Sequence, residues 1–343
     1  MIFYLVTRNN VNVINWYLEQ WGQPLVSLIR PVYYDQITRQ RKLPSGTYIF
    51  SDIERLSPQD AEKAAWIWTQ LSQIDSGVRL LNHPLWSMCR YELLRTLYNQ
   101  NINQFNIYRL TEDPKPQRFP VFVRGENDHS GNQTALLETM EDLDHAIAEI
   151  VQQGQNRQNK VIIEFCDTRD AQGLFKKYSA FTIGEQIIPV HVRYQNNWVV
   201  KAQTLNTEAR EAENKDYVTN NPHEQQLREI FKTARIQYGR IDYSLLDDQI
   251  QVWEINTNPT ICHFSNTIDS HPLNSIVASN LQKAFEAINL ASNLTNVISN
   301  HHQPTEQEDN LEFVSVVSHW FQWLPKQQQV NLRKTLRKLK SKL

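Results

Sequence analysis

The segments GRIDY (residues 239–243) and WEINTNP (residues 253–259) carry the clearest pattern in the chain. Both have the composition of strands, and the short polar stretch between them predicts an antiparallel hairpin. In such a pair Asp242 and Glu254 project from one face, and Asn256 shares that face because strand side chains alternate with a period of two. Two carboxylates and an amide oxygen suit Mg²⁺, which prefers oxygen ligands. The spacing alone leaves a second interpretation open, a hairpin whose acids simply face solvent.

The composition predicts a folded protein of about two packed units. The 343 residues are 40% hydrophobic and 21% charged, which allows a sizeable buried core. Lys and Arg number 35 against 37 Asp and Glu, so the formal net charge is −2. This balance argues against a general nucleic-acid-coating protein, and no nucleic acid is expected to bind the core.

Cysteine usage and the first residues predict a reducing compartment. Cys89, Cys166 and Cys262 are too few and too widely spaced for a disulfide framework or a zinc pattern. The segment MIFYLVTRNN (residues 1–10) lacks the basic stretch that precedes the apolar run of a secretory signal. No apolar stretch approaches the ~20 residues that a bilayer span needs. We therefore expect a soluble, cytoplasmic protein.

Strand and helix patterns alternate along the chain, which predicts a mixed α/β fold. Ser57-Pro58, followed by acids at Asp60 and Glu62, has the signature of a helix start. The other expected helices are 12–21, 90–97, 134–153, 223–236 and 273–290. The expected strands are 2–7, 47–50, 119–124, 161–165, 178–183, 186–193, 198–201, 239–245 and 250–255.

Four motifs, in the same order along the chain, resemble those of the ATP-grasp superfamily. They are NHP (82–84) ahead of a helix, FPVFVR (119–124), VIIEF (161–165), and a closing Asp followed about a dozen residues later by Glu-x-Asn-x-x-Pro. The resemblance covers roughly residues 80–290. It implies an α/β (α+β) protein with an ATP-grasp fold of two lobes, a preceding small α/β pre-ATP-grasp domain and a C-terminal helical tail.

The resemblance and the composition together predict five parts. Residues 1–85 are the pre-ATP-grasp domain, 86–160 the N-lobe and 161–290 the C-lobe with the metal site. Residues 291–310, rich in Asn, Gln and His, are expected to be a linker, and 311–343 a basic amphipathic helical tail.

The resemblance also assigns functional residues by position. It implies one or two Mg²⁺ ions held against the phosphates of ATP by Asp242, Glu254 and Asn256. The residues implied to contact ATP are Arg90, Arg124, Glu164, Phe165, Cys166, Lys177 and Lys201. Those implied to neutralise charge during catalysis are Arg124, Arg193 and Lys201.

Several of these positions depart from the family pattern. Arg90 and Arg124 stand where two lysines normally contact the phosphates, which keeps the charge and adds bidentate geometry. A solvated helix cation is the other interpretation of Arg90. Lys177 stands where many relatives carry an acid for the ribose hydroxyls. The expected phosphate flap, residues 126–131, is poor in glycine, so a side chain such as His129 is expected to replace backbone contacts unless it is a plain surface residue.

The implied reaction is the ATP- and Mg²⁺-dependent activation of a carboxylate. The γ-phosphoryl group passes to a carboxylate oxygen, which gives an acyl phosphate and ADP, and an amine, or less often a thiol, then displaces phosphate. The expected substrates are a small-molecule or peptide carboxylate and an amine. Two alternatives stay open: a kinase of the same fold that phosphorylates a small molecule, and a catalytically silent nucleotide-binding regulator.

The end of the chain has a pattern of its own. Leu332, Leu336 and Leu339 recur at helical spacing, and residues 326–343 hold seven cations and no acid. One interpretation is a terminal helix that docks on the body or pairs between the subunits of a homo-oligomer. The other is contact with an anionic membrane, an acidic partner or RNA.

Overall fold

The computed structural model describes residues 1–40, 42–74, 77–128, 131–200, 207–262, 271–289 and 296–297. The chain divides into two compact units, residues 1–299 and residues 300–343. The second unit, with the predicted tail and most of the predicted linker, lies outside the described residues. The finer domain boundaries stay predictions. None of the helices in the described part of the chain combines the length and apolar character that a membrane crossing requires.

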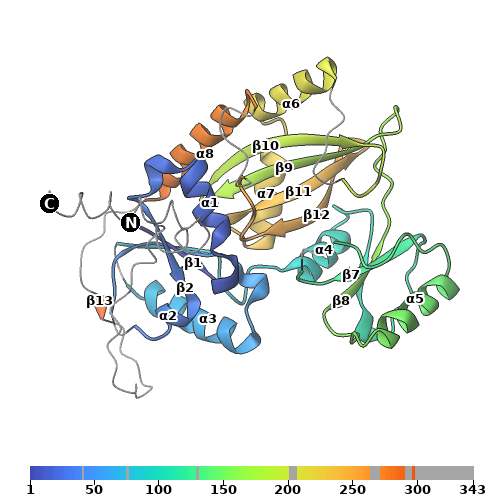
Figure 1. Ribbon diagram of the computed structural model, residues 1–343, viewed down its shortest axis with the longest axis horizontal. Coiled ribbons are helices and arrows are strands. Elements are labelled where there is room, and N and C mark those ends of the chain that lie inside the picture. Colours follow the sequence, from blue (N-terminus) through green and yellow to red (C-terminus); the bar gives the residue numbers. More distant parts are fainter. Residues whose placement is uncertain are drawn as a thin grey trace, which may run out of the picture. The chain divides into compact units, whose positions relative to one another are not determined.

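A parallel four-stranded sheet forms the N-terminal part of the first unit (Figure 1). Its strand order is β2-β1-β4-β5, and β1 and β4 are buried along their whole length. Buried strands of this kind read as continuous apolar runs, which is why β1 and β4 could be predicted. The strands are β1 Ile2–Val6, β2 Ile29–Tyr33, β4 Gly46–Phe50 and β5 Val78–Leu81.

The helices of this part are α1 Asn12–Gln20, α2 Tyr34–Ile37 and α3 Pro58–Ser72. The predicted start of α3 is confirmed, because Ser57 Oγ accepts a hydrogen bond from Asp60 N at 3.1 Å. A separate two-stranded pair joins β3 Lys42–Leu43 to β13 Asn296–Val297.

A small antiparallel sheet of order β6-β8-β7 follows along the chain. Helix α5, Met140–Gln152, packs Leu143 and Ile150 against Val121, Val123 and Ile162 of this sheet. In Figure 1, α5 accordingly covers one face of the small sheet. The strands are β6 Ile107–Arg109, β7 Val121–Gly125 and β8 Lys160–Glu164.

The expected start of α5 at residue 134 is wrong. The helix begins at Met140 because Thr139 caps it: the Thr139 side chain accepts from Asp142 N, and the Asp142 side chain accepts from Thr139 N. This reciprocal cap fixes the first turn, and residues 134–139 precede it as an irregular segment.

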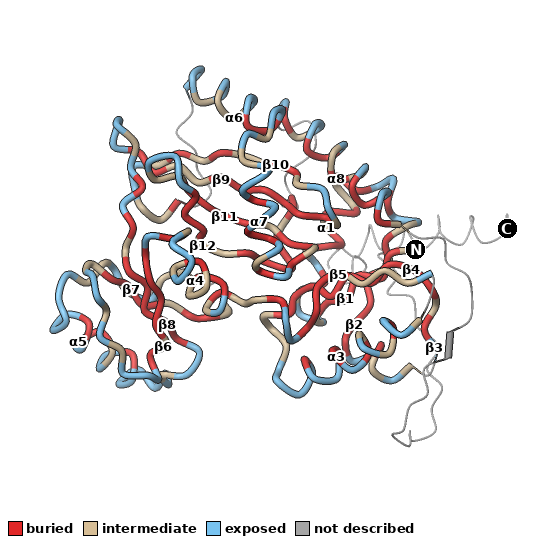
Figure 2. The backbone as a smooth tube through the Cα atoms, turned by 180° about the vertical axis from the view of Figure 1, so that it is seen from behind, coloured by how far each residue is buried: buried red, intermediate tan, exposed pale blue. Residues whose placement is uncertain are grey.

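A large antiparallel sheet of order β10-β9-β11-β12 forms the rest of the unit. On one face, Tyr178 stacks on Tyr243 and meets Tyr217 of α6 edge to face. Figure 2 shows the central strands β9 and β11 largely buried. The strands are β9 Phe175–Ile183, β10 Gln186–Gln195, β11 Tyr238–Leu246 and β12 Gln249–Asn256. The helices are α6 Glu208–Asn220, α7 Glu224–Ala234 and α8 Asn274–Ile288.

The expected strand at 198–201 is wrong for residues 198–200, which belong to no strand. Strand β10 ends at Gln195 and the chain then turns, with Asn197 Oδ1 accepting a hydrogen bond from Val199 N at 2.9 Å. Asparagine side chains that bond the backbone two residues ahead favour turns over strands. Lys201 lies outside the described residues.

Helix α4, Arg90–Asn99, joins the small and large sheets because it contacts both β6 and β12. Just beyond it, the Asn103 side chain accepts from Val252 N at 2.8 Å and donates to Val252 O at 3.0 Å. These bonds continue the hydrogen-bond ladder at the outer edge of β12. The two sheets are thereby held around α4 (Figure 1).

Candidate active site

One face of the large sheet collects polar side chains from all four strands. The register pairs Asp242 of β11 with Glu254 of β12 and with Ser179 of β9. Cross-strand partners project from the same face, so the predicted antiparallel pairing of the two carboxylate-bearing strands is confirmed. The polar residues on this face include Lys177, Ser179, His191, Arg193, Arg240, Asp242, Glu254 and Asn256.

Asp242 is almost fully buried and is surrounded by donors. Its Oδ1 accepts from Ser179 Oγ at 2.9 Å and from Arg240 Nε at 3.0 Å, and its Oδ2 lies 3.1 Å from Lys177 Nζ. Burial acts to raise the pKa of Asp242, but the charges of Arg240 and Lys177 outweigh it and hold that pKa well below its usual range. Asp242 is therefore a carboxylate at every pH of interest.

The carboxylate of Glu254 is held by Arg90, the first residue of α4. Arg90 Nη2 donates to Glu254 Oε2, and the Arg90 side chain is only 6% exposed. Two residues along β12, Asn256 Oδ1 accepts from Asn258 N at 2.8 Å. All three predicted metal ligands thus have defined orientations.

The donor set formed by Asp242, Glu254 and Asn256 fits a hard divalent cation. The first two stand directly opposite each other across neighbouring strands, and the third is on the same face. All three offer oxygen, which Mg²⁺ prefers over nitrogen or sulfur. Within the residues that the structure describes, no group of three or more His, Cys, Asp and Glu side chains could hold a metal, so the set depends on the amide of Asn256. Its role as a metal site stays a prediction.

Arg124, on β7, differs from Arg90 in having no bonded partner among the residues that the structure describes. Among the described residues its guanidinium makes no hydrogen bond or ion pair, and its Nε is buried. Burial lowers the pKa of Arg124 to about 10, with a further contribution from the charge of Arg90. The charges of Glu254 and Asp128 act in the opposite direction, and the group stays protonated at neutral pH. Without a bonded acceptor among the described residues, this cation is suited to a phosphate.

The predicted adenine hinge, residues 164–166, follows β8. Glu164 is fully buried, and its carboxylate accepts from Tyr108 Oη at 2.8 Å, from Asn106 N at 3.0 Å and from the Arg118 guanidinium at 3.2 Å. Both Glu164 oxygens are thus already bonded within the protein, and the contact predicted between this side chain and adenine stays a prediction.

The hinge also carries an aromatic group that the sequence analysis did not identify. The ring of Trp198 lies 4.9 Å from Phe122 and 5.8 Å from Phe165, measured between ring centroids. Cys166 is buried beside Gln251. Phe122, Phe165 and Trp198 therefore form an apolar cluster beside the hinge, of the kind that an adenine ring would require.

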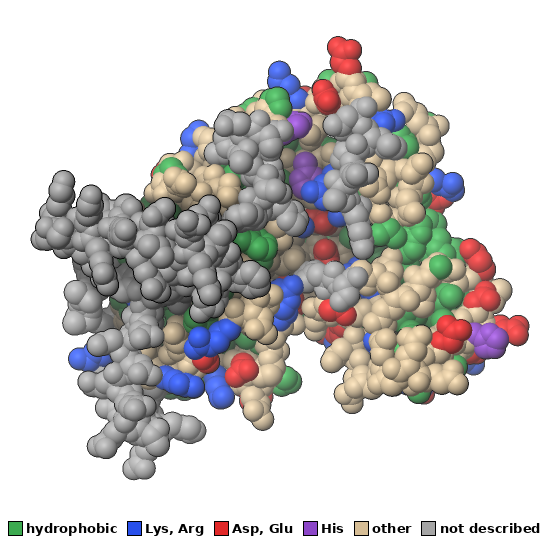
Figure 3. All heavy atoms as spheres, viewed as in Figure 1, with side chains coloured by type: hydrophobic (Ala, Val, Ile, Leu, Met, Phe, Trp, Pro, Cys, Tyr) green, Lys and Arg blue, Asp and Glu red, His purple; other side chains and the backbone are tan. Residues whose placement is uncertain are grey.

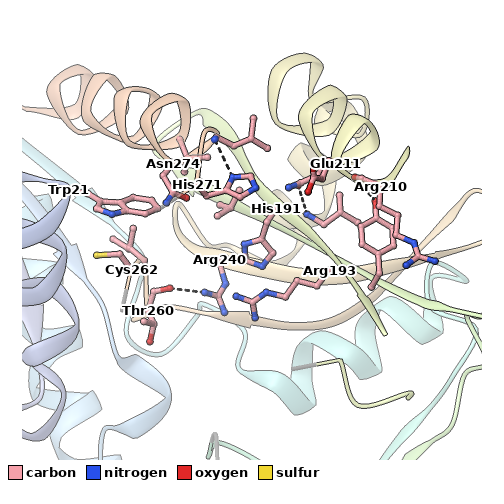
Figure 4. A pocket seen from close by; sticks show the side chains of 17 residues that line it. Trp21, His191, Arg193, Arg210, Glu211, Arg240, Thr260, Cys262, His271 and Asn274 are labelled. Atoms are coloured by element: carbon pink, nitrogen blue, oxygen red, sulfur yellow. Dashed lines mark hydrogen bonds between the residues drawn. The ribbon is translucent and has the colours of Figure 1, made fainter. Parts of the chain in front are cut away.

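A cavity of about 530 Å³ is lined in part by Arg240, which donates a hydrogen bond to Asp242 (Figure 4). Figure 4 shows Arg193, Arg240 and His191 pointing toward one another on its floor. Trp21 and Cys262 lie at one end of it. Cationic and histidine side chains are also visible within a hollow on the face shown in Figure 3. The cavity is thus lined by a cationic floor and an apolar end.

The two guanidinium groups on this floor are unequally compensated. Arg240 donates to Asp242 and, through Nη1, to Thr260 O at 2.8 Å. The Arg193 guanidinium forms no hydrogen bond or ion pair within the described residues, and burial followed by the charge of Arg240 lowers its pKa. Burial and the charges of both arginines hold the pKa of His191 well below its usual value. A second anion would relieve the repulsion at this floor.

Two of these residues, Arg240 and His191, were missed by the sequence analysis. Arg240 lies two residues before Asp242, so the strand period alone could have identified it as a neighbour on the same face. His191 lies in the site because β10 pairs with β9 and places it opposite Ser179. No local sequence pattern predicts this pairing. Two predicted residues, Lys201 and His129, lie outside the described residues.

Comparison with known proteins gives matches among solved structures only. No family model and no curated protein matches the sequence. The D-alanine–D-alanine ligase from Bacillus anthracis matches with a TM-score of 0.50 and 13% identity, covering 84% of this chain and 96% of that one. The same ligase complexed with ATP gives a TM-score of 0.48 at 13% identity, over 84% of this chain and 96% of that one. The ligase from Helicobacter pylori gives 0.43 at 13% identity, over 82% of this chain and 98% of that one.

The first of these matches covers most of both chains, and its identity of 13% makes it a likeness of fold. The fold class expected from the four motifs agrees with it. The chain therefore has the ATP-grasp fold that its sequence predicts.

Proposed function

We propose that the protein is an ATP- and Mg²⁺-dependent ligase that joins a carboxylate to an amine and releases ADP and phosphate. The observation that carries this proposal is the placement of Asp242 opposite Glu254 on β11 and β12, next to a cavity floored by two guanidinium groups. Paired carboxylates suit a metal–triphosphate, and paired guanidinium groups suit a second anion. The Bacillus anthracis structure of the same fold is a D-alanine–D-alanine ligase, which supports this reaction class.

In this proposal the nucleotide lies between the two sheets. The adenine packs on the apolar side chains around Phe165 and Trp198, and Arg124 and Lys177 face the phosphates. Asp242, Glu254 and Asn256 hold Mg²⁺, which supplies neutralisation of the phosphate charge when bound. Burial strengthens these charge interactions because little water screens them.

The carboxylate substrate then binds in the cavity, with its oxygens on Arg193 and Arg240. A carboxylate oxygen attacks the γ-phosphorus, the bond to the ADP oxygen breaks, and an acyl phosphate forms. The amine attacks the acyl carbon, loses its proton and expels phosphate. The chain's part in both steps is to hold the reactants in line and to neutralise charge, as expected for phosphoryl transfer.

The test is incubation of the full chain with Mg-ATP and pools of carboxylic acids and amines, followed by mass analysis. We expect ADP, phosphate and a product with the mass of the joined substrates less water. Release of AMP, or a stable phosphate ester in place of an amide, would contradict the ligase assignment and, in the second case, indicate a kinase.

Two variants localise the activity. Asp242→Asn and Arg193→Met should each lower kcat/KM by about a hundredfold or more, because each removes a buried charge aimed at the reactants. Matched controls are Asp144→Asn on α5 and Arg39→Met. Each removes the same kind of charge from an exposed side chain that is not among the predicted site residues. Loss of activity in the controls as well would show that charge removal in general, and not the site, is responsible.

A further inference from the structure

The family resemblance implies the same role, contact with the phosphates, for Arg90 and Arg124. In the structure their side chains have very different environments. Arg90 Nη1 donates to the carbonyl oxygens of Glu126 at 2.7 Å and of Gly125 and Asp128 at 3.2 Å. Its Nη2 donates to Glu254. Both terminal nitrogens of Arg90 are thus directed at protein oxygens and not at a phosphate.

These bonds connect three separate parts of the chain. Arg90 opens α4, Gly125 ends β7 and residues 126–128 begin the predicted flap, and Glu254 lies on β12. The loop 125–128 is itself compact, because a Cβ on Gly125 would overlap the carboxylate of Asp128. One buried guanidinium therefore fixes both the base of the flap and a predicted metal ligand.

Only an arginine can make this set of contacts. Its planar fork presents five N–H donors in fixed directions, whereas a lysine ammonium is a compact point charge with three donors. Arg124, in contrast, has no hydrogen-bond or ion-pair partner within the described residues, although the Nε atom is buried and without a partner in both arginines. The two cations thus have complementary environments, one with its terminal nitrogens bonded and one without a bonded partner.

We infer that Arg90 is a positioning residue that holds Glu254 and the flap base 125–128 in place, and that contact with the nucleotide phosphates falls to Arg124. This inference rests on the proposed function for its second half. Its first half concerns the free protein and can be tested without any ligand.

The test uses three substitutions in the full chain, Arg90→Lys, Arg90→Met and Arg124→Met. Amide hydrogen exchange of the free protein reports on residues 126–128, where Glu126 N donates to Asn159 O at 2.8 Å. Calorimetric titration with ATP in EDTA reports on phosphate contact without the metal. The ligase assay, where active, separates kcat from the KM for ATP.

Both Arg90 variants should speed exchange at 126–128 by about tenfold or more, because the carbonyl bonds to Nη1 are lost. Arg90→Lys should keep the affinity for metal-free ATP within about twofold and lower kcat more than it raises KM. Arg124→Met should weaken ATP binding by about tenfold or more and leave exchange at 126–128 unchanged.

A variant of the loop itself guards against a folding defect in the Arg90 variants. Gly125→Ala leaves Arg90 in place but forces the Asp128 carboxylate aside, so it should raise exchange at 126–128 by a local route that does not involve a change at residue 90. If the loop exchanges no faster in Arg90→Lys than in the parent protein, the positioning role is excluded.

The outcomes also separate this inference from the proposed function. If Arg90→Lys weakens ATP binding as much as Arg124→Met does, Arg90 is a phosphate ligand and the inference is overturned, while the ligase proposal survives. If the parent protein binds no ATP, the ligase proposal fails, and loop exchange alone then decides the role of Arg90.

Discussion

The three cysteine thiols show how burial controls chemistry at single residues. Burial raises the pKa of Cys89 and of Cys262 to about 12 and that of Cys166 to about 11. The thiolate is the reactive form of cysteine, and a pKa near 11 or 12 leaves almost none of it at pH 8. None of the three is therefore placed to act as a nucleophile in the reaction proposed.

This gives a direct prediction for thiol reagents. At pH 8 the folded protein should react with a chromogenic disulfide at least about a hundredfold more slowly than in denaturant, where the thiol pKa returns to about 8.5. All three thiols should become available together on unfolding. Rapid reaction of one thiol in the folded protein would show that its site opens without global unfolding.

The functional residues illustrate what sequence can and cannot reveal at this scale. Asp242, Glu254 and Asn256 could be predicted to share one face of a sheet because a period of two and a short turn bring them together locally. The contact between Arg90 and Glu254 joins residues 164 positions apart. No local pattern encodes such a contact, so the different roles of Arg90 and Arg124 could not be separated until the fold placed them.

The elements that were easiest to predict are those with a recognisable capping residue or a clear apolar face. Helix α3 has Ser57 and Pro58 at its start, and it was found in place. Helix α6 was missed because only Tyr217 and Val218 are buried along its 13 residues, so it has almost no apolar stripe to read. Tertiary packing, not its own pattern, accounts for its position.

The cap of α5 gives a prediction for this element. Thr139→Ala removes the side-chain acceptor for Asp142 N and should lower the free energy of unfolding by about 1 kcal/mol. Denaturant unfolding followed by far-UV circular dichroism measures this. Thr111→Ala, at an exposed threonine between β6 and β7, is the control and should change stability by less than about 0.5 kcal/mol. Equal effects would mean that the cap contributes nothing specific.

The start of β11 depends on a glycine for close approach of two backbones. A Cβ on Gly239 would lie 2.9 Å from Asn256 O and 3.2 Å from Ile255 Cγ2. Because the first of these is a backbone atom, Gly239→Ala must separate β11 from β12 at the end that carries Asn256.

We expect Gly239→Ala to lower the free energy of unfolding by about 1–3 kcal/mol. It should also weaken Mg-ATP binding more than metal-free ATP binding, because it moves Asn256 relative to Asp242. Calorimetric titration in Mg²⁺ and in EDTA measures the two. An equal loss in both conditions would argue against Asn256 as a metal ligand.

For the whole molecule, the order of motifs was more informative than any single element. The ATP-grasp fold followed from four short segments in sequence order, although the solved ligase of the same fold shares only 13% identity. Fold tolerates such divergence because the core needs apolar residues of suitable volume and not particular side chains. The fold does not identify the substrate, because proteins of one fold differ in the side chains that line their cavities.

The division of the chain into residues 1–299 and 300–343 leads to a prediction about the tail. Every described residue proposed to contact ATP or Mg²⁺ belongs to the first unit. Deletion of residues 311–343 should therefore leave the dissociation constant for Mg-ATP within about twofold of the full chain, as measured by calorimetric titration. The deletion also removes seven cations, so any residual effect on binding should fade as salt is raised from 0.05 to about 0.5 M. A truncated chain that folds, by circular dichroism, but no longer binds nucleotide at any salt concentration would place the tail within the active site and would require the substrate cavity to be reassigned.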